Sequence, residues 1–409
     1  MRFRVRGHGV KPIVSGYGQL TARLLWCDGP MTSPADLIIN WDVAQSAAAR
    51  LVPPGPPLKP PAAAQEVADL RQSAAEAVSY VHTITGLSAA EGLGADQRDV
   101  LVVDRPGWSA ANTDSFRKLL RPALEAAAEK KPQLFSEGSS AQVLGSAAAG
   151  AELGGILAFL SANVLGQFDP FHTSEQAPAG RLLLVAPNIV EIAKQLNVDR
   201  SDFRLWVCLH EQTHRVQFAA APWLRDHLMS SISTLSISTM SQADALPQRI
   251  AEAVKGLRQE LKQQKSGGQG DAAAETHPRN RLLEAIQSPE DREIMSHLTA
   301  VMSLLEGHAN VVMDAVDASI VPTVKTIRRR FEQRGKNRSP LEKVIRKLLQ
   351  LDAKAAQYRD GQKFVGHIVE TVGMERFNTI WESPEHLPTE TELHNPDDWI
   401  GRMGFTPQG

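Results

Sequence analysis

Two histidines four residues apart flank a glutamate in residues 209–214, which read L-H-E-Q-T-H. Because residues four apart on a helix share one face, His210 and His214 could hold one metal ion between their imidazoles. Glu211, directly after the first histidine, could take the proton of a water bound to that ion. The pattern predicts a zinc site that keeps one position open, as catalytic zinc sites do. The alternative is a pair of buried histidines bonded to backbone carbonyls.

The residues around this motif predict a helix over 200–220. Asp199 or Ser201 can cap its first turn. Phe203 and Phe218 lie on the same helical stripe as the two histidines. The imidazoles should therefore point into the protein, with an apolar shell around any ion.

A zinc ion bound in this way needs a third protein ligand, and a long helix downstream offers two candidates. This helix begins after Ser288, a good N-cap, and runs to about residue 319. Glu306 and His308 point about 160° apart on it, so they cannot both bind one ion. Glu306 is preferred, because a carboxylate at the edge of a buried stripe needs a partner; His308, or a salt-bridged Glu306 without metal, is the alternative. The stripe that should be buried consists of Met295, Leu298, Met302, Leu305, Ala309, Val312, Met313 and Val316.

Further side chains could assist this centre. Hydrogen bonds to the motif histidines could come from Asn310, Asp314 and Asp317. A peptidase also needs a donor for the oxyanion of its tetrahedral intermediate, and Tyr358 is preferred over Arg359 and His367. The alternative for Tyr358 is a core tyrosine bonded to backbone. Arg215, next to the second histidine, should form a salt bridge with a neighbouring helix.

The composition is that of a globular protein: of 409 residues, 42% are hydrophobic and 22% charged, and the net charge is −2. This balance excludes a global preference for nucleic acid or anionic membranes. With only Cys27 and Cys208 there is no disulfide framework, so a cytoplasmic setting is expected, and Cys208 should be a small core residue. The most apolar stretch, residues 153–165, is short and should form a buried core helix rather than a membrane span.

The pattern of apolar residues predicts a mainly α-helical (α+β) fold with a small β-sheet. Short apolar runs at 100–103 and 182–185 predict strands, and Asp169-Pro170 predicts a turn. Helices are expected over 39–51, 64–86, 111–130, 140–166, 188–196, 200–220, 288–319, 325–335, 340–351 and 361–373.

A single domain is expected over residues 34–409, preceded by a loose extension over residues 1–33. Met31, just before the first helix, is an alternative start of translation. Within the domain, residues 53–61 read as a stiff proline-rich linker and residues 264–278 as a flexible low-complexity loop.

A basic cluster follows the long downstream helix and consists of Arg328, Arg329, Arg330, Arg334, Lys336 and Arg338. Such a cluster could bind phosphate, but few aromatic residues interleave with it. A solvated helix end is therefore the favoured interpretation, and neither a nucleic acid nor a membrane is expected as partner.

Several stretches resemble a bacterial family of zincin-like metallopeptidases, whose members are uncharacterised hydrolases, sometimes tagged as associated with deazaflavin-cofactor biosynthesis. These stretches are residues 40–42, 104–108, 165–169, 182–188, 209–218, 222–225, 305–309 and 351–359. The resemblance covers about residues 36–403, while the N-terminal 30 residues and the loop at 264–278 depart from it. It implies a mainly helical zincin fold with His210, His214 and Glu306 as ligands and Glu211 as base.

Together these features predict a metallohydrolase that uses Zn²⁺, and more narrowly a cytoplasmic peptidase acting on a peptide or protein substrate. Glu211 would take a proton from the attacking water and pass it to the leaving amine. The alternative is a non-catalytic zincin-like protein, in which zinc is structural or the cleft binds a peptide. Retention of Glu211 argues against this alternative, because a structural zinc ion has no use for a base there.

Overall fold

A computed structural model describes residues 37–93, 99–130, 140–173, 180–242, 288–336 and 351–406. Within these ranges it does not describe the side chains at 141, 241–242, 335–336 and 351–358. The expected extension at 1–33 with Met31, the loop at 264–278 and nearly all of the helix expected over 340–351 lie outside the described residues.

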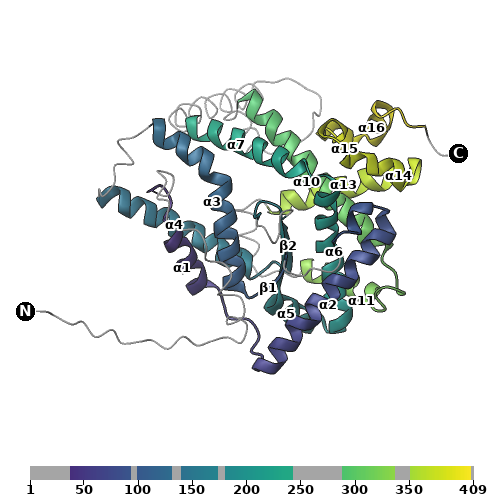
Figure 1. Ribbon diagram of the computed structural model, residues 1–409, viewed down its shortest axis with the longest axis horizontal. Helices are drawn as coiled ribbons and strands as arrows, with labels where there is room; N and C mark the ends of the chain where they lie inside the picture. The colour runs from purple at the N-terminus through teal and green to yellow at the C-terminus, as the bar shows by residue number, and fades with distance from the viewer. Residues whose placement is uncertain are drawn as a thin grey trace, which may run out of the picture.

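Helices dominate the described chain and surround a small central sheet, which confirms the predicted fold class (Figure 1). The helices before the motif are α1 (Trp41–Leu51), α2 (Pro60–Thr85), α3 (Arg105–Lys130), α4 (Ser140–Ser161) and α5 (Ala186–Leu196). The motif lies on α6 (Arg200–Ala220), which is followed by α7 (Leu224–Gln242), α10 (Pro289–Ala315), α11 (Val324–Lys336) and α13 (Leu351–Val372). Short helices near the C-terminal end include α14 (Met374–Phe377), α15 (Glu390–His394) and α16 (Pro396–Arg402).

The sheet has three strands in the order β1-β3-β2. Strands β1 (Val100–Val103) and β3 (Arg181–Val185) form where the two apolar runs predicted strands, and they pair in parallel. Strand β2 (Gly166–Asp169) pairs antiparallel with β3 and forms one edge of the sheet. The alternation of side chains in the central strand therefore decides which helices cover which face.

Two helical layers cover the two faces of this sheet. Leu182 and Leu184 of β3 belong to the core cluster that includes α2 and α6. Leu183 and Val185 pack in a second cluster with Trp108 of α3 and neighbouring residues of α1 and α4. The motif helix thus lies on one face of the sheet, and α3 lies on the other.

The helix starts follow local signals in the sequence. The Asp199 side chain caps α6 by accepting from a first-turn N–H at 2.9 Å, and Ser288 caps α10 at 3.0 Å. Pro60 and Pro61 begin α2 instead of extending the proline-rich linker. The first turn of a helix suits proline, because its N–H groups have no partner within the helix.

Strand β2 was not predicted. Residues up to 166 were assigned to a helix, but α4 ends at Ser161 and the chain then forms the edge strand. Asp169 is the last residue of that strand. The turn therefore begins at Pro170, one residue later than predicted. A four-residue segment at a sheet edge pairs with only one neighbour and carries little periodicity to recognise.

Helix α4 packs closely on α1 through two glycines. A Cβ at Gly150 would lie 2.3 Å from the Asn40 carbonyl oxygen, and one at Gly154 would lie 2.5 Å from that of Ala44. Residues 142–161 are long and apolar enough to cross a membrane, with mean hydropathy 1.7 and 28% of the window buried, which by itself is weak evidence for a span. In the stretch at 153–165, Gly154, Leu157, Ala158 and Ser161 are buried while most other residues are half-buried, so the expected burial is only partial.

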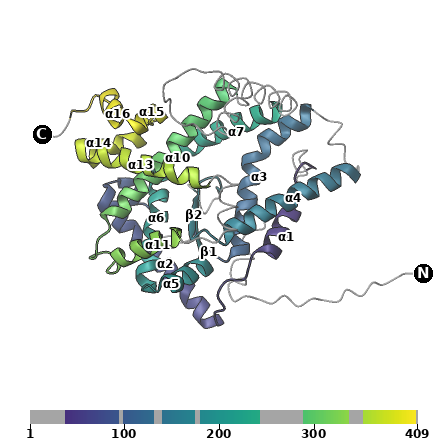
Figure 2. The same ribbon diagram turned by 180° about the vertical axis from the view of Figure 1, so that it is seen from behind.

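Helices α10 and α13 cross at two glycines and lie side by side in both views (Figures 1 and 2). A Cβ at Gly361 would lie 1.9 Å from the Ser303 carbonyl oxygen, and one at Gly307 would lie 2.2 Å from the carbonyl carbon of Gly361. Such backbone contact excludes any side chain at these positions. Gly307, which contacts α13 at this crossing, directly follows Glu306 in the sequence.

The stripe expected to be buried on α10 is buried only in its C-terminal half, which contains Leu305, Ala309, Val312, Met313 and Val316. Met295 and Met302 are 39% and 43% exposed, and Glu306 lies one turn after Met302 on the same side. The helix instead turns Ala300 and Leu304 fully inward. The close approach of α13 sets this rotation, so the side of α10 that carries Glu306 borders solvent.

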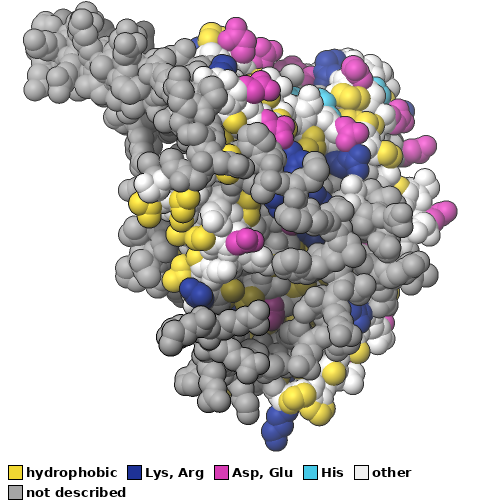
Figure 3. Space-filling view, turned by 60° about the vertical axis from the view of Figure 1, so that its left-hand side comes forward, with side chains coloured by type: hydrophobic (Ala, Val, Ile, Leu, Met, Phe, Trp, Pro, Cys, Tyr) yellow, Lys and Arg dark blue, Asp and Glu magenta, His cyan; other side chains and the backbone are white. Residues whose placement is uncertain are grey.

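Two arginines of the basic cluster bind the C-terminal ends of other helices. Arg328 donates to the carbonyls of Met313 and Val316 at the end of α10, the latter at 3.2 Å. Arg330 donates to the Leu196 carbonyl at the end of α5 at 2.8 Å. On the face that Figure 3 draws, acidic side chains lie beside basic ones. Arg329 is exposed, as expected of a solvated helix end, whereas Arg328 and Arg330 are half-buried and cap other helices.

Candidate metal centre

Three side chains with metal-binding atoms meet between α6 and α10. The Nε2 atoms of His210 and His214 lie 3.3 Å apart. Glu306 places Oε2 at 3.8 Å from Nε2 of His210 and Oε1 at 3.9 Å from Nε2 of His214. One potential ligand atom from each residue lies within 4.8 Å of the others, in the one such group that the described residues contain.

The donors in this group suit zinc. Two nitrogen ligands at about 2.05 Å from a tetrahedral ion lie about 3.3 Å apart, which matches the separation of the two imidazoles. A carboxylate completes a set of two histidines and one glutamate, which is known for catalytic zinc. His210 and Glu306 are 27% and 25% exposed, so substrate or water could approach. A wholly structural ion would be enclosed by four protein ligands.

His210 is held in the form that a metal requires. Burial, and secondly the neighbouring His214, lower its pKa from 6.5 to about 4, against the opposing effect of Glu306. The ring is therefore neutral near pH 7, with a lone pair available for an ion.

Glu211 directly follows His210 on α6, and its side chain packs against Gly166, the first residue of β2. Its side chain is 8% exposed. A Cβ at Gly166 would lie 2.7 Å from Cγ and 2.8 Å from Cδ of Glu211, so only glycine leaves room for this carboxyl. Burial, followed by the charge of Glu306, raises the pKa of Glu211 from 4.5 to about 8. A carboxyl poised in this way is suited to accept and return a proton near neutral pH.

His308, the alternative third ligand, lies away from the cluster. It is fully buried, and its ring packs against Phe377 and Trp381 with centroids 5.4 and 5.3 Å away. Its Nδ1 lies 2.9 Å from Nε2 of Gln217. Burial, and secondly His214, lower its pKa to about 3, so the ring is neutral. The structure brings Glu306, and not His308, to the two motif histidines.

The hydrogen-bond partner of His214 is Gln217, and not one of the three residues predicted from the sequence. His214 Nδ1 lies 3.0 Å from Oε1 of Gln217, three residues later on the same helix. Asp314 instead accepts from Gln362, and Asp317 accepts from Ser319. Asn310 has no hydrogen bond to either histidine in the described part of the chain. The spacing of Gln217 from His214 on one helical face was the signal that could have identified it.

The candidates for the oxyanion donor all lie on α13. Tyr358 belongs to α13, three residues before the crossing at Gly361, and its side chain is outside the described residues. Arg359 is exposed, and His367 pairs with Asp397 at 2.7 Å. The role of Tyr358 therefore stays a prediction.

Arg215 is buried, and its salt bridge leads to Asp99 in the segment before β1 rather than to a neighbouring helix. Asp99 precedes a strand of the sheet that α6 covers, which explains why the contact crosses to that layer. Cys208 is fully buried against the Leu70 carbonyl, and burial raises the pKa of its thiol, as expected of a core residue.

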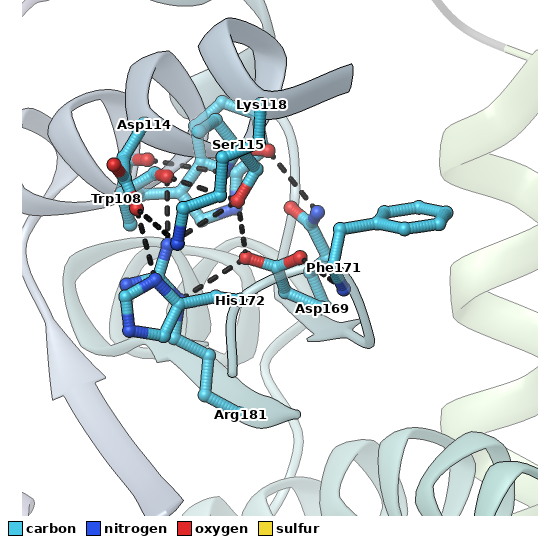
Figure 4. Close-up of polar contacts among 11 residues, drawn as sticks. Trp108, Asp114, Ser115, Lys118, Asp169, Phe171, His172 and Arg181 are labelled. Carbon is cyan, nitrogen blue, oxygen red and sulfur yellow. Dashed lines mark hydrogen bonds and ion pairs between the residues drawn. The ribbon is translucent and has the colours of Figure 1, made fainter. Parts of the chain in front are cut away.

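A buried ion pair holds the other end of β2 to α3 (Figure 4). Arg181 of β3 donates to Asp169 at 3.1 Å and to the Ala111 carbonyl of α3 at 2.7 Å. Ser115 of α3 donates to the same carboxylate at 2.6 Å. All the charged atoms are nearly inaccessible to water, so these bonds define the position of the strand whose first residue is Gly166.

The family is shown by comparison with known proteins. The model of a family described as zincin-like metallopeptidase matches residues 39–400. The chain belongs to this family. The zincin-like recognition made from the sequence is confirmed, and the match includes both motif histidines, Glu211 and Glu306.

One solved structure resembles the zincin-like chain over most of its length. It comes from Chloroflexus aurantiacus and is described as "a putative hydrolase with a novel fold". The identity is 29%, the TM-score is 0.58, and the alignment covers 90% of this chain and 99% of the other. No curated protein matches the chain. Membership of a zincin-like family implies a bound metal, and His210, His214 and Glu306 are the described residues arranged to hold one.

Proposed function

We propose that this protein is a zinc-dependent hydrolase and, more narrowly, a peptidase. The observation that carries the proposal is the meeting of His210, His214 and Glu306 within 4.8 Å, together with the buried carboxyl of Glu211, whose pKa the charge of Glu306 helps to raise. The family description and the hydrolase description of the Chloroflexus structure support the same reaction class.

Three of these residues would bind the metal, and the fourth would transfer the proton. His210, His214 and Glu306 would hold the ion, which when bound supplies a Lewis acid that polarises a carbonyl, acidifies water and favours the ionised form of Glu211. Glu211 then accepts the proton of the attacking water and delivers it to the nitrogen of the leaving amine. The Gly166 backbone packs against the Glu211 carboxyl and would limit its movement during these proton transfers.

The decisive experiment combines metal analysis with hydrolysis of a peptide library read by mass spectrometry. The native protein should hold one zinc ion and cleave peptides, while Glu211→Gln should hold one zinc ion and cleave none. Zinc without cleavage in the native protein would favour the alternative of a peptide-binding zincin-like protein. A native protein purified without chelators that holds no metal and cannot be loaded with it would overturn the proposal.

A further inference from the structure

A fully buried amide joins the two helices that carry the candidate ligands. Gln217 lies on α6 three residues after His214, and its side chain reaches α10. Its Oε1 is 3.0 Å from Nδ1 of His214. Its Nε2 is 2.9 Å from the Leu305 carbonyl oxygen and 2.9 Å from Nδ1 of His308. Both N–H groups of the amide and its oxygen are therefore engaged.

The Leu305 carbonyl determines the direction of these hydrogen bonds, because a carbonyl can only accept. Gln217 must turn its amino group towards α10, and its oxygen therefore faces His214. Since that oxygen can only accept, His214 must carry its proton on Nδ1. The lone pair of its Nε2 is then free on the side where His210 and Glu306 lie.

The same orientation of the amide determines the tautomer of His308. Its Nδ1 accepts from Gln217, so its proton is on Nε2, which has no hydrogen-bond partner in the described part of the chain. Rotation of the amide by 180° would set its oxygen against the Leu305 carbonyl oxygen, which can only accept, and turn its amino group towards His214. The ring of His308 itself packs against Phe377 and Trp381.

We propose that Gln217 is a positioning residue of the metal centre, which sets the tautomer of His214 and ties α6 to the peptide group that precedes Glu306. The carbonyl that Gln217 binds belongs to the peptide bond between Leu305 and Glu306. One amide thus orients a ligand on each helix. This inference rests on the proposed metal site.

The test compares Gln217→Met with Gln212→Met in the full chain. Both side chains are buried amides on α6, but Gln212 donates to the Ala74 carbonyl of α2 at 2.7 Å and makes no bond to a candidate ligand. Zinc affinity is measured by competition with a chromophoric chelator, and the visible spectrum of the Co²⁺-loaded protein reports ligand geometry. Gln217→Met should weaken zinc binding by about 10–100-fold and alter the Co²⁺ spectrum, whereas Gln212→Met should do neither.

The possible failures can be told apart. A native protein that binds no zinc would refute the proposed function and this inference with it. If the native protein binds zinc, and both variants bind it as tightly and with the same Co²⁺ spectrum, only the role of Gln217 is refuted. Should Gln217→Met not fold, His308→Phe removes one of the two acceptors while preserving an aromatic ring. It should weaken zinc binding several-fold, and unchanged affinity with an unchanged spectrum would overturn the proposal.

Discussion

The buried carboxyl of Glu211 should make the metal-free protein less stable as pH rises. Its pKa is about 8 in the folded protein, because of burial and the charge of Glu306, against 4.5 for an unperturbed glutamate. The unfolded chain therefore loses this proton first, and between these values the folded state binds one proton more. The free energy of unfolding must fall with rising pH across that window.

Glu211→Gln removes this titration and keeps the size of the side chain. At about 1.4 kcal/mol per pH unit, the stability of the variant relative to the native protein should rise by about 3 kcal/mol between pH 5 and pH 7.5. Urea unfolding followed by tryptophan fluorescence, with a chelator present, measures both proteins at each pH. Other titrating groups are common to the two proteins and cancel in the difference.

The matched control is Glu129→Gln, which changes an exposed glutamate on α3. Its difference from the native protein should stay constant over the same pH range. If the difference for Glu211→Gln also stays constant, Glu211 does not retain a proton in the folded protein and the reasoning is refuted. Excess zinc should reduce the pH dependence, because a nearby cation stabilises the carboxylate.

Three further outcomes are expected. Gly361→Ala should destabilise the protein by about 3 kcal/mol in urea unfolding, because its Cβ would overlap a carbonyl of α10. The control Gly366→Ala lies on the same helix, where a Cβ meets nothing within 4 Å, and should not destabilise the protein. Equal effects of the two would contradict the crossing. Gly166→Ala should leave zinc content unchanged and lower peptide cleavage by at least tenfold, because the added Cβ displaces Glu211. Cleavage at the native rate would show that the Cβ does not displace the carboxyl. Zinc at 100 times its Kd should raise the free energy of unfolding by about 3 kcal/mol over the chelated protein, and a comparable gain in Glu306→Ala would exclude Glu306 as a ligand.

The sequence determined the features that depend on residues close together in the chain. The helix caps at Asp199 and Ser288 act within four residues, and the apolar runs of β1 and β3 are continuous in the chain. The spacing of His210 and His214 follows from the pitch of one helix. The same geometry separated Glu306 from His308, because two residues on one helix have a known angle between them.

Contacts between distant segments were decided only by the tertiary structure. The sequence pattern placed Gly166 at the end of a helix, and only the pairing of β2 with β3 brings it against Glu211. The exposure of Met302 follows from the rotation of α10, which the glycine crossing with α13 sets. Gln217 finds its acceptors on α10, about ninety residues further along the chain. Such contacts depend on how helices pack, and a hydrophobic pattern shows that a helix has a buried side without specifying which neighbour covers it.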